Sequence, residues 1–317
     1  MEYLKASARI ESIFDCLRKS FMYRNFIEIE KKALKLGPKP VAVLFPDSPD
    51  VIKAVIEGAD KGLIKPILVG DRTKIEMITQ QFNIKLDDFK IIDEKEPQKA
   101  SDKCIDMART GIVAFVVKGN IITSYLYRSL IRHTKTNTPD QTPCTLCFHQ
   151  ADNIKKVFII TDPGVNINPD VSIKRKILNN AVNAQHRMGC KNPKIMIISA
   201  DHISGSKAKK QNETDILRQL AKDNKMGECR LSNTKNLNSE FPNHRVETDD
   251  FPDIFLVPNI DAGNILVKSI DHLGGGVRQC VTVGGDITVL TPSRSDRSAD
   301  RILNLSLGVI LSEPGGV

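Results

Sequence analysis

The sequence predicts an α/β fold in which strands and helices alternate along most of the chain. Short runs rich in Val and Ile recur, and amphipathic segments of helical length separate them. These runs are apolar almost throughout instead of alternating with polar residues, which is typical of strands in a largely parallel sheet covered by helices on both faces. The 317 residues suffice for two domains or for one large α/β unit.

The expected elements follow from this alternation. Strands are expected at residues 41–45, 66–70, 89–93, 112–117, 157–161, 195–199, 254–258, 280–284 and 287–291. Helices are expected at residues 50–61, 73–82, 123–132, 173–187, 213–223, 263–273 and 298–311. The first twenty or so residues are expected to add a helix ahead of the core. The polar stretches 133–147 and 224–250 are expected to be an inter-domain crossing and a loop with one weak element.

Composition limits the classes of function. The chain carries 46 Lys and Arg against 38 Asp and Glu, a net charge of +8. These basic residues are dispersed, and with 5% aromatics and no Trp they argue against nucleic-acid binding. An anionic small ligand and an ordinary basic surface both remain open. No apolar run approaches the roughly 18–20 residues of a membrane helix, and the first residues do not have the pattern of a secretory signal.

The cysteines indicate a reduced, cytoplasmic protein, because an odd number spread over a chain of this length is not typical of a disulfide framework. They are Cys16, Cys104, Cys144, Cys147, Cys190, Cys229 and Cys280. Cys144 and Cys147, with His149 close behind, have a spacing that metal and redox sites use. No second ligand pair follows, so we expect no metal and interpret the two cysteines as an incidental pair beside a strand; metal or redox chemistry is the alternative.

The most informative segment runs from residue 288 to residue 311. A strand is followed by a turn containing Ser293, Arg294 and Asp296, and then by a helix with Asp300 in its first turn. A helix N-terminus attracts anions, and an arginine beside it offers a two-point contact for phosphate. Asp300 can serve as a base. The alternative is that Ser and Asp merely cap the helix.

Further candidates follow other strands of the predicted sheet. Lys118 and Asn120 come after one strand, Thr123 is expected to cap the next helix, and Arg128 lies on that helix. Asn264 follows another strand. Carboxyl ends of strands are where open α/β sheets bind ligands, although a solvent-exposed helix arginine is the commoner case for a residue such as Arg128.

Taken in order, the motifs resemble one family. V-K-G-N-x-x-T at 117–123, T-D-P-G-V-N-I-N-P-D at 161–170, A-G-N-I-L-x-K-S at 262–269 and S-R-S-D at 293–296 are similar to the phosphate acetyltransferase/phosphate butyryltransferase family, and more closely to its butyryl branch. The resemblance implies two α/β domains with a cleft between them, like those of isocitrate and isopropylmalate dehydrogenases. Residues 1–135 with 277–317 would form the first domain, and residues 136–276 the second.

The resemblance also implies a reaction. Such enzymes reversibly convert a short-chain acyl-CoA, such as butyryl-CoA or acetyl-CoA, and phosphate to acyl phosphate and coenzyme A. Coenzyme A is a substrate, no tightly bound cofactor or metal is needed, and the protein is expected to be a cytoplasmic homodimer or larger homo-oligomer. The residues carried over are Ser293 and Arg294 with Asp300 or Asp296 as the base, and Arg128, Lys118, Asn120, Thr123 and Asn264 as substrate-binding residues.

Some positions depart from the family pattern. Ser124 and Tyr125 follow Thr123 where the family usually has T-A-D, and residues 227–231 replace a D-G-P-like stretch. Arg297 appears as an insertion after S-R-S-D, which makes Asp296 and Asp300 rival bases. These departures leave open an alternative function, a non-catalytic or regulatory paralogue that binds coenzyme A or acyl phosphate.

Overall fold

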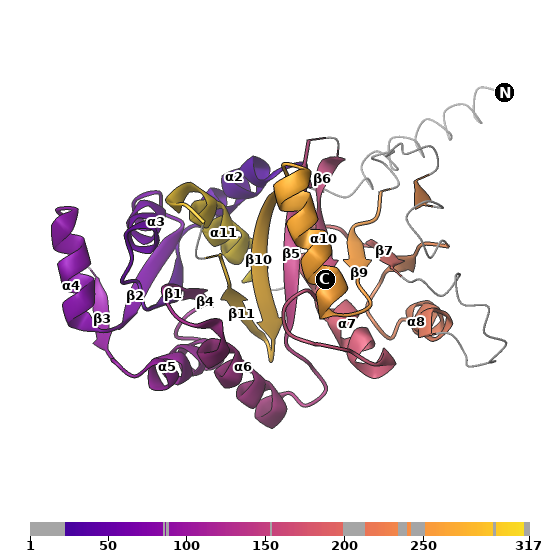
Figure 1. Ribbon diagram of the computed structural model, residues 1–317, viewed down its shortest axis with the longest axis horizontal. Helices are drawn as coiled ribbons and strands as arrows, with labels where there is room; N and C mark the ends of the chain where they lie inside the picture. The colour runs from indigo at the N-terminus through magenta and orange to yellow at the C-terminus, as the bar shows by residue number, and fades with distance from the viewer. Residues whose placement is uncertain are drawn as a thin grey trace, which may run out of the picture.

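A single mixed sheet forms the centre of the protein (Figure 1). The computed structural model describes residues 23–84, 86, 89–152, 154–198, 213–233, 240–241, 251–293 and 296–313. Their eleven strands follow the order β3-β2-β1-β4-β11-β10-β5-β6-β9-β7-β8. The strands are β1 (Lys39–Leu44), β2 (Ile64–Gly70), β3 (Lys90–Asp93), β4 (Phe115–Lys118), β5 (Cys144–Ala151), β6 (Ile154–Thr161), β7 (Lys194–Ile197), β8 (Arg230–Leu231), β9 (Ile254–Leu256), β10 (Val277–Gly284) and β11 (Ile287–Leu290).

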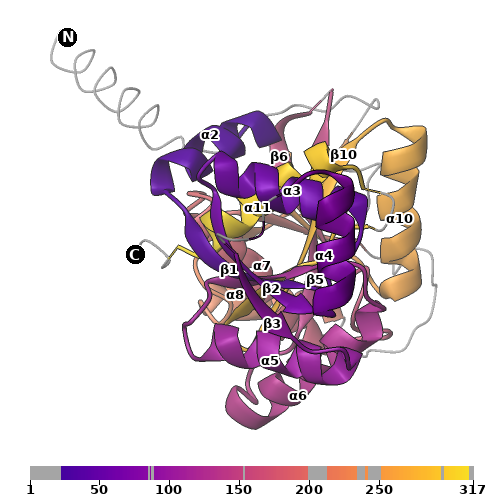
Figure 2. The same ribbon diagram turned by 90° about the vertical axis from the view of Figure 1, so that its left-hand side faces the viewer.

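Helices cover both faces of this sheet, as the apolar strands required. They are α2 (Phe26–Leu36), α3 (Pro49–Asp60), α4 (Arg72–Gln81), α5 (Pro97–Arg109), α6 (Thr123–Asn137), α7 (Val171–Arg187), α8 (Glu213–Lys222), α10 (Ile260–Leu273) and α11 (Ser298–Leu311). Over the part of the sheet that contains β1 to β4, helices α2, α3 and α11 lie on one face and α5 and α6 on the other (Figure 2). None of the helices in the described ranges is long and apolar enough to span a membrane.

Strand direction divides the sheet into two blocks. β3, β2, β1, β4 and β11 are mutually parallel, and so are β6, β9, β7 and β8. Between the blocks, β5 is antiparallel to both β6 and β10, and β10 is antiparallel to β11. The largely parallel α/β prediction is therefore confirmed, with an antiparallel centre that joins two oppositely directed blocks.

The register of the strands places the carboxyl ends of both blocks at the same level, in one row of paired residues that runs across the sheet. Leu290, the last residue of β11, lies opposite Val281 of β10, which lies opposite Leu146 of β5. Leu146 in turn lies opposite Thr161, the last residue of β6. Val117, one residue from the end of β4, pairs with Leu290. Polar residues that follow β4, β11 and β6 thus meet over the middle of the sheet.

Several expected elements have different ends, and some were not expected. The helix at 123–132 extends to Asn137, and Ile122 takes the N-cap position predicted for Thr123. The expected crossing at 133–147 is consequently only 138–143, because β5 already begins at Cys144. Helices α2 and α5 were not expected, and β8 is the weak element foreseen within 224–250. The extra helix expected in the first twenty residues lies outside the described residues.

The apolar core matches the predicted runs. β1 buries Val41 to Leu44 completely, and α11 is buried along nearly its whole length, including Ile302, Leu307 and Ile310. Helix α11 packs against α2 and α3 as well as on β10 and β11. The C-terminal hairpin and helix therefore belong structurally with the N-terminal strands. The exact division into domains at residues 135 and 277 stays a prediction, since one sheet runs through both parts.

Candidate active site

A cleft of about 570 Å³ lies over the row where the two blocks of strands meet. Its walls come from both blocks and from the N-terminal parts of α6 and α10. The lining residues are Lys118, Ile122, Thr123, Ser124, Tyr127, Thr145, Cys147, Pro163, Gly164, Asn264, Val267, Lys268, Arg278, Cys280, Thr291, Pro292 and Ser293.

Four of the residues singled out from the sequence line this cleft: Lys118, Thr123, Asn264 and Ser293. Lys118 ends β4 and is only 4% exposed. The next residue, Gly119, has to be a glycine, because a Cβ at this position would lie 2.2 Å from the carbonyl oxygen of Phe45. That close packing of β4 against the end of β1 fixes the position of Lys118.

Two other candidates lie elsewhere. Arg128 is exposed, its Nη1 donates a hydrogen bond to Oε1 of Gln98 at 2.8 Å, and its guanidinium stacks over Tyr125. Asn120 is exposed as well, and its backbone N–H donates to the carbonyl of Phe45 at 2.8 Å. The structure does not bring either residue into the cleft lining, and their substrate-binding roles stay predictions. Arg294 lies outside the described residues.

The segment around Ser293 is held by hydrogen bonds to the start of α11. The backbone N–H of Ser293 donates to Oδ2 of Asp296 at 2.7 Å. Arg301 donates to the carbonyl oxygens of both Ser293 and Asp296, at 3.0 and 3.1 Å. These hydrogen bonds fix the turn between β11 and α11, and this turn places Ser293 in the lining of the cleft.

The two rival aspartates differ in environment. Asp300 accepts a hydrogen bond from the backbone N–H of Arg297 at 3.3 Å, so it performs the capping role that the sequence left open. Asp296 is partly buried next to cleft-lining Ser293, and burial raises the pKa of its carboxyl, although the hydrogen bond from the Ser293 backbone and the cations Arg278 and Arg301 oppose that rise. Neither aspartate is among the residues that line the cleft. A partly buried carboxyl with a raised pKa is better suited to proton transfer at neutral pH than a solvated one.

The sequence analysis missed the contribution of β10. Arg278 and Cys280, two residues apart on this strand, both face the cleft, as alternate residues of a strand must. The Nε of Arg278 lies 2.9 Å from Oδ2 of Asp271 on α10. Arg278 and Thr282 share one face of this strand, but Gln279 between them is polar as well, so the sequence carried no clear signal for which face lines a site.

The cleft also contains hydroxyl groups and an excess of positive charge. Tyr127 Oη lies 3.0 Å from Oγ1 of Thr282, and burial raises the pKa of its phenol. Lys118, Lys268 and Arg278 supply cations, and Arg278 is paired with an acid. Such a lining suits a phosphate-bearing ligand, because arginine and lysine bind phosphate oxygens directly and the surrounding protein focuses their field.

The Cys144–Cys147 spacing does not form one site. Three residues apart on β5, the two side chains point to opposite faces of the sheet. Cys144 is fully buried beside Asn180, whose Nδ2 lies 3.4 Å from its sulfur, whereas Cys147 faces the cleft. Within the described ranges no three His, Cys, Asp or Glu side chains are grouped to hold a metal ion.

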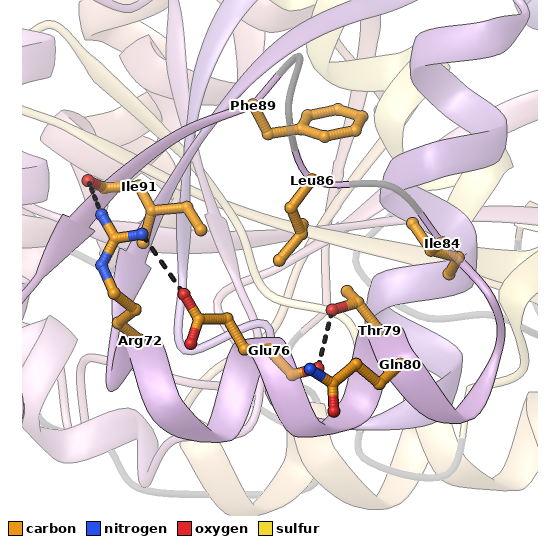
Figure 3. A pocket seen from close by; sticks show the side chains of 8 residues that line it. All are labelled: Arg72, Glu76, Thr79, Gln80, Ile84, Leu86, Phe89 and Ile91. Carbon is orange, nitrogen blue, oxygen red and sulfur yellow. Dashed lines mark hydrogen bonds and ion pairs between the residues drawn. The ribbon is translucent and has the colours of Figure 1, made fainter.

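A second hollow, of about 420 Å³, lies beside α4 at the β3 edge of the sheet (Figure 3). Its polar groups are already engaged: Arg72 contacts Glu76 at 3.4 Å and donates to the carbonyl of Ile91 at 3.3 Å, and the Thr79 hydroxyl donates to the carbonyl of Ile75 at 2.9 Å. The rest of the lining is mainly apolar. This hollow therefore offers no group for acyl or phosphoryl chemistry, and we assign the candidate site to the central cleft.

The sequence profile of the family described as "Phosphate acetyl/butaryl transferase" matches residues 103–307. The chain belongs to this family. The phosphate butyryltransferase of Clostridium acetobutylicum is 26% identical over 92% of this chain and 99% of its own length. The phosphate acetyltransferase of Rickettsia felis is 25% identical, over 90% and 84% of the two chains.

Solved structures agree on the fold. A phosphotransacetylase from Streptococcus pyogenes superimposes with a TM-score of 0.72 at 15% identity, over 90% of this chain and 98% of that one. The expected dehydrogenase-like α/β fold and the resemblance to the phosphate acetyl/butyryltransferase family are thereby confirmed. This family consists of acyltransferases, and the profile match spans all the residues that line the cleft, from Lys118 to Ser293.

Proposed function

We propose that this member of the family transfers a short acyl group, such as butyryl or acetyl, between coenzyme A and phosphate in the central cleft. The observation that carries the proposal is the meeting of Lys118, Arg278 and Ser293 in one recess, from strands far apart in sequence. Cations fixed on strands hold phosphate without needing to reorganise, which is how a site stabilises charge that develops during a reaction.

The chemistry follows from these groups. Phosphate, held by Lys118, Arg278 and Arg294, attacks the thioester carbonyl through one oxygen, and the carbon–sulfur bond then breaks. Ser293 donates a hydrogen bond to the oxyanion or to the departing sulfur. In the reverse direction a base removes the proton of the thiol, whose pKa is about 8–9 by analogy with cysteine.

We propose Asp296 as this proton-transfer residue. Its raised pKa, its partial burial and its contact with Ser293 support the choice, whereas the carboxylate of Asp300 is engaged in capping α11. A protonated Asp296 would return its proton to the leaving thiolate, and its conjugate base would accept one in reverse.

The departures from the family pattern also favour turnover over a binding-only paralogue. Tyr125 lies under the guanidinium of Arg128 and is not part of the cleft lining. The replaced stretch at 227–231 ends in β8, the outermost strand of the sheet. Neither departure removes a group from the cleft, so the alternative of a regulatory coenzyme A-binding protein has less support.

The test is thiol release from acyl-CoAs of two to five carbons when phosphate is added to the purified protein. Asp296→Asn and Asp300→Asn form a matched pair, since they are the same change four residues apart. We expect Asp296→Asn to lower kcat/KM by about 100-fold or more, and Asp300→Asn to lower it less than about threefold while costing roughly 1 kcal/mol of stability.

Opposite magnitudes would reassign the base to Asp300. Binding of coenzyme A by calorimetry without turnover of any acyl-CoA in the panel would instead support the paralogue. We further propose that the enzyme acts in the cytoplasm as a homodimer or larger homo-oligomer with no tightly bound cofactor. Light scattering of the purified protein tests the oligomeric state.

A further inference from the structure

Two cysteines from different strands meet at the floor of the cleft. Cys147 of β5 and Cys280 of β10 lie directly opposite each other in the antiparallel register, and their sulfur atoms are 2.7 Å apart. Sequence spacing could not have paired them, because 133 residues separate them. The chain's other described cysteines lie outside the cleft lining.

The backbone at this point suits a covalent link. The carbonyl of Cys280 accepts a hydrogen bond at 3.1 Å from the backbone N–H of Thr291, the residue that follows β11, so the polar groups of Cys280 face away from β5. Cys147 and Cys280 are therefore a non-hydrogen-bonded antiparallel pair, in which Cα atoms stand about 4.5 Å apart. That spacing lies within the roughly 4.4–6.8 Å that a disulfide spans.

The two sulfurs are not equivalent. The hydrogen bond from Cys147 lowers the pKa of Cys280, burial opposes that shift, and the nearby Arg278 cation lowers the pKa further. Burial raises the pKa of Cys147. Nη1 of Arg278 lies 3.5 Å from the Cys280 sulfur. Asp271 and Asp296 oppose part of this effect. Cys280, which is also the more exposed of the two, is thus the nucleophilic member and Cys147 the proton-bearing one.

We propose that Cys147 and Cys280 form an oxidisable dithiol that hydrogen peroxide converts to a disulfide across β5 and β10. The Cys280 thiolate attacks one peroxide oxygen, the O–O bond breaks, and the departing hydroxide is protonated to water. The Cys147 sulfur then attacks the resulting sulfenic acid, forming the S–S bond while the S–O bond breaks and water leaves with the Cys147 proton. Overall two thiols lose two electrons and the peroxide becomes two waters.

The disulfide would change the cleft as well as link two strands. A disulfide cannot carry the negative charge that a Cys280 thiolate would place beside Arg278, and it fixes two lining residues together. It follows, resting on the proposed function, that oxidation lowers acyl transfer and that bound coenzyme A shields the pair. The oxidation itself requires no turnover, so the two proposals fail separately.

The experiment treats the reduced protein with hydrogen peroxide, quenches it, and counts free thiols after denaturation. We expect the loss of two thiols and a Cys147–Cys280 cross-linked peptide in non-reducing mass spectrometry, both reversed by dithiothreitol. Cys144→Ser is the matched control, since Cys144 lies on the same strand but on the opposite face and is fully buried. Its oxidation should equal that of the wild type, whereas Cys280→Ser should slow thiol loss by at least about tenfold.

A second probe covers the case in which a variant fails to fold. Phenylarsine oxide binds two adjacent thiols through one arsenic atom, so the wild-type protein should bind one equivalent and then resist peroxide. A cross-link between other cysteines, or equal thiol loss in Cys280→Ser and Cys144→Ser, would overturn the proposal. So would wild-type protein that keeps both thiols under peroxide in the absence of any ligand.

Discussion

His149 makes the protein's stability depend on pH between about 4 and 6.5. This histidine on β5 is completely buried and stacks on Phe158 with ring centroids 5.5 Å apart. Its Nδ1 lies 3.0 Å from the carbonyl oxygen of Cys147, and its Nε2 lies 3.8 Å from Oδ1 of Asp271. Burial lowers the pKa of His149 from 6.5 to about 4, with the Arg278 cation adding to the effect.

The sign follows from proton binding in the two states. In the unfolded chain the imidazole takes up a proton below about pH 6.5, and in the folded protein only below about pH 4. Between these values the unfolded state binds more protons, so the free energy of unfolding falls as the pH is lowered. At about 1.4 kcal/mol per pKa unit, the full contribution is about 3 kcal/mol, and about 2 kcal/mol of it is lost at pH 5.

The assay is guanidinium unfolding at pH 7.5 and pH 5 for the wild type and for His149→Asn. The amide can keep the hydrogen bond to the Cys147 carbonyl but does not titrate. We expect the wild type to lose about 2 kcal/mol more than the variant between the two pH values. His272→Asn, a change at an exposed histidine, should retain the wild-type pH dependence. Equal pH dependence in the wild type and His149→Asn would refute the reasoning.

Three further predictions concern Arg294, Asp253 and Gly119. Arg294→Ala should lower kcat/KM for phosphate by roughly 30–1000-fold. Arg294→Lys should lower it by less, because lysine keeps the charge but loses the two-point contact. A near wild-type kcat/KM of Arg294→Ala in steady-state assays would show that Arg294 does not bind phosphate. Asp253→Asn should cost about 3–5 kcal/mol in denaturant unfolding, because the buried Lys156, 2.7 Å from Asp253, would lose its counter-charge; a loss below about 1 kcal/mol would contradict this. Gly119→Ala should raise KM for phosphate and destabilise the protein by about 1–3 kcal/mol, since the new Cβ would clash with backbone oxygens of Leu44 and Phe45; an unchanged KM would show that Lys118 does not depend on this packing.

The sequence predicted most elements that are rich in large apolar residues, although α2, which buries Phe26 and Ile29, was missed. Helix α11 was predicted with its observed ends, Ser298 and Leu311. Helix α5 was missed because its buried side includes Ala100, Ser101 and Cys104, small residues that give a weak helical pattern. Strand β5 was missed for a similar reason, since it contains Thr145 and His149 although it is largely buried from both sides.

The site residues at strand ends were predicted from the same logic. Lys118 ends β4 and Ser293 follows β11, and a parallel sheet brings such ends together whatever lies between them. Arg128 could have been placed more accurately, because successive helix residues are about 100° apart. Thr123 and Tyr127 share one face of α6 at a spacing of four and line the cleft, whereas Arg128 is turned toward Gln98 on α5.

Arg278 and Cys280 could not be assigned without the topology. Polar residues on a strand normally face water, and only the central place of β10 in the sheet turns the face of Arg278 and Cys280 into the floor of a cleft. The same reasoning applies to Cys147, whose partner became visible only through the pairing of β5 with β10.

A short turn sets the geometry of this floor. Gly285 and Asp286 join β10 to β11 with positive φ values of 61° each, as a two-residue type I′ hairpin requires. Because a two-residue loop fixes the strand register, it places Thr291 beside Cys280, where its N–H donates to the Cys280 carbonyl at 3.1 Å. Ser293 is two residues further on. The proposed phosphate-binding loop and the cysteine pair are therefore positioned by the same hairpin, and a change of register would displace both.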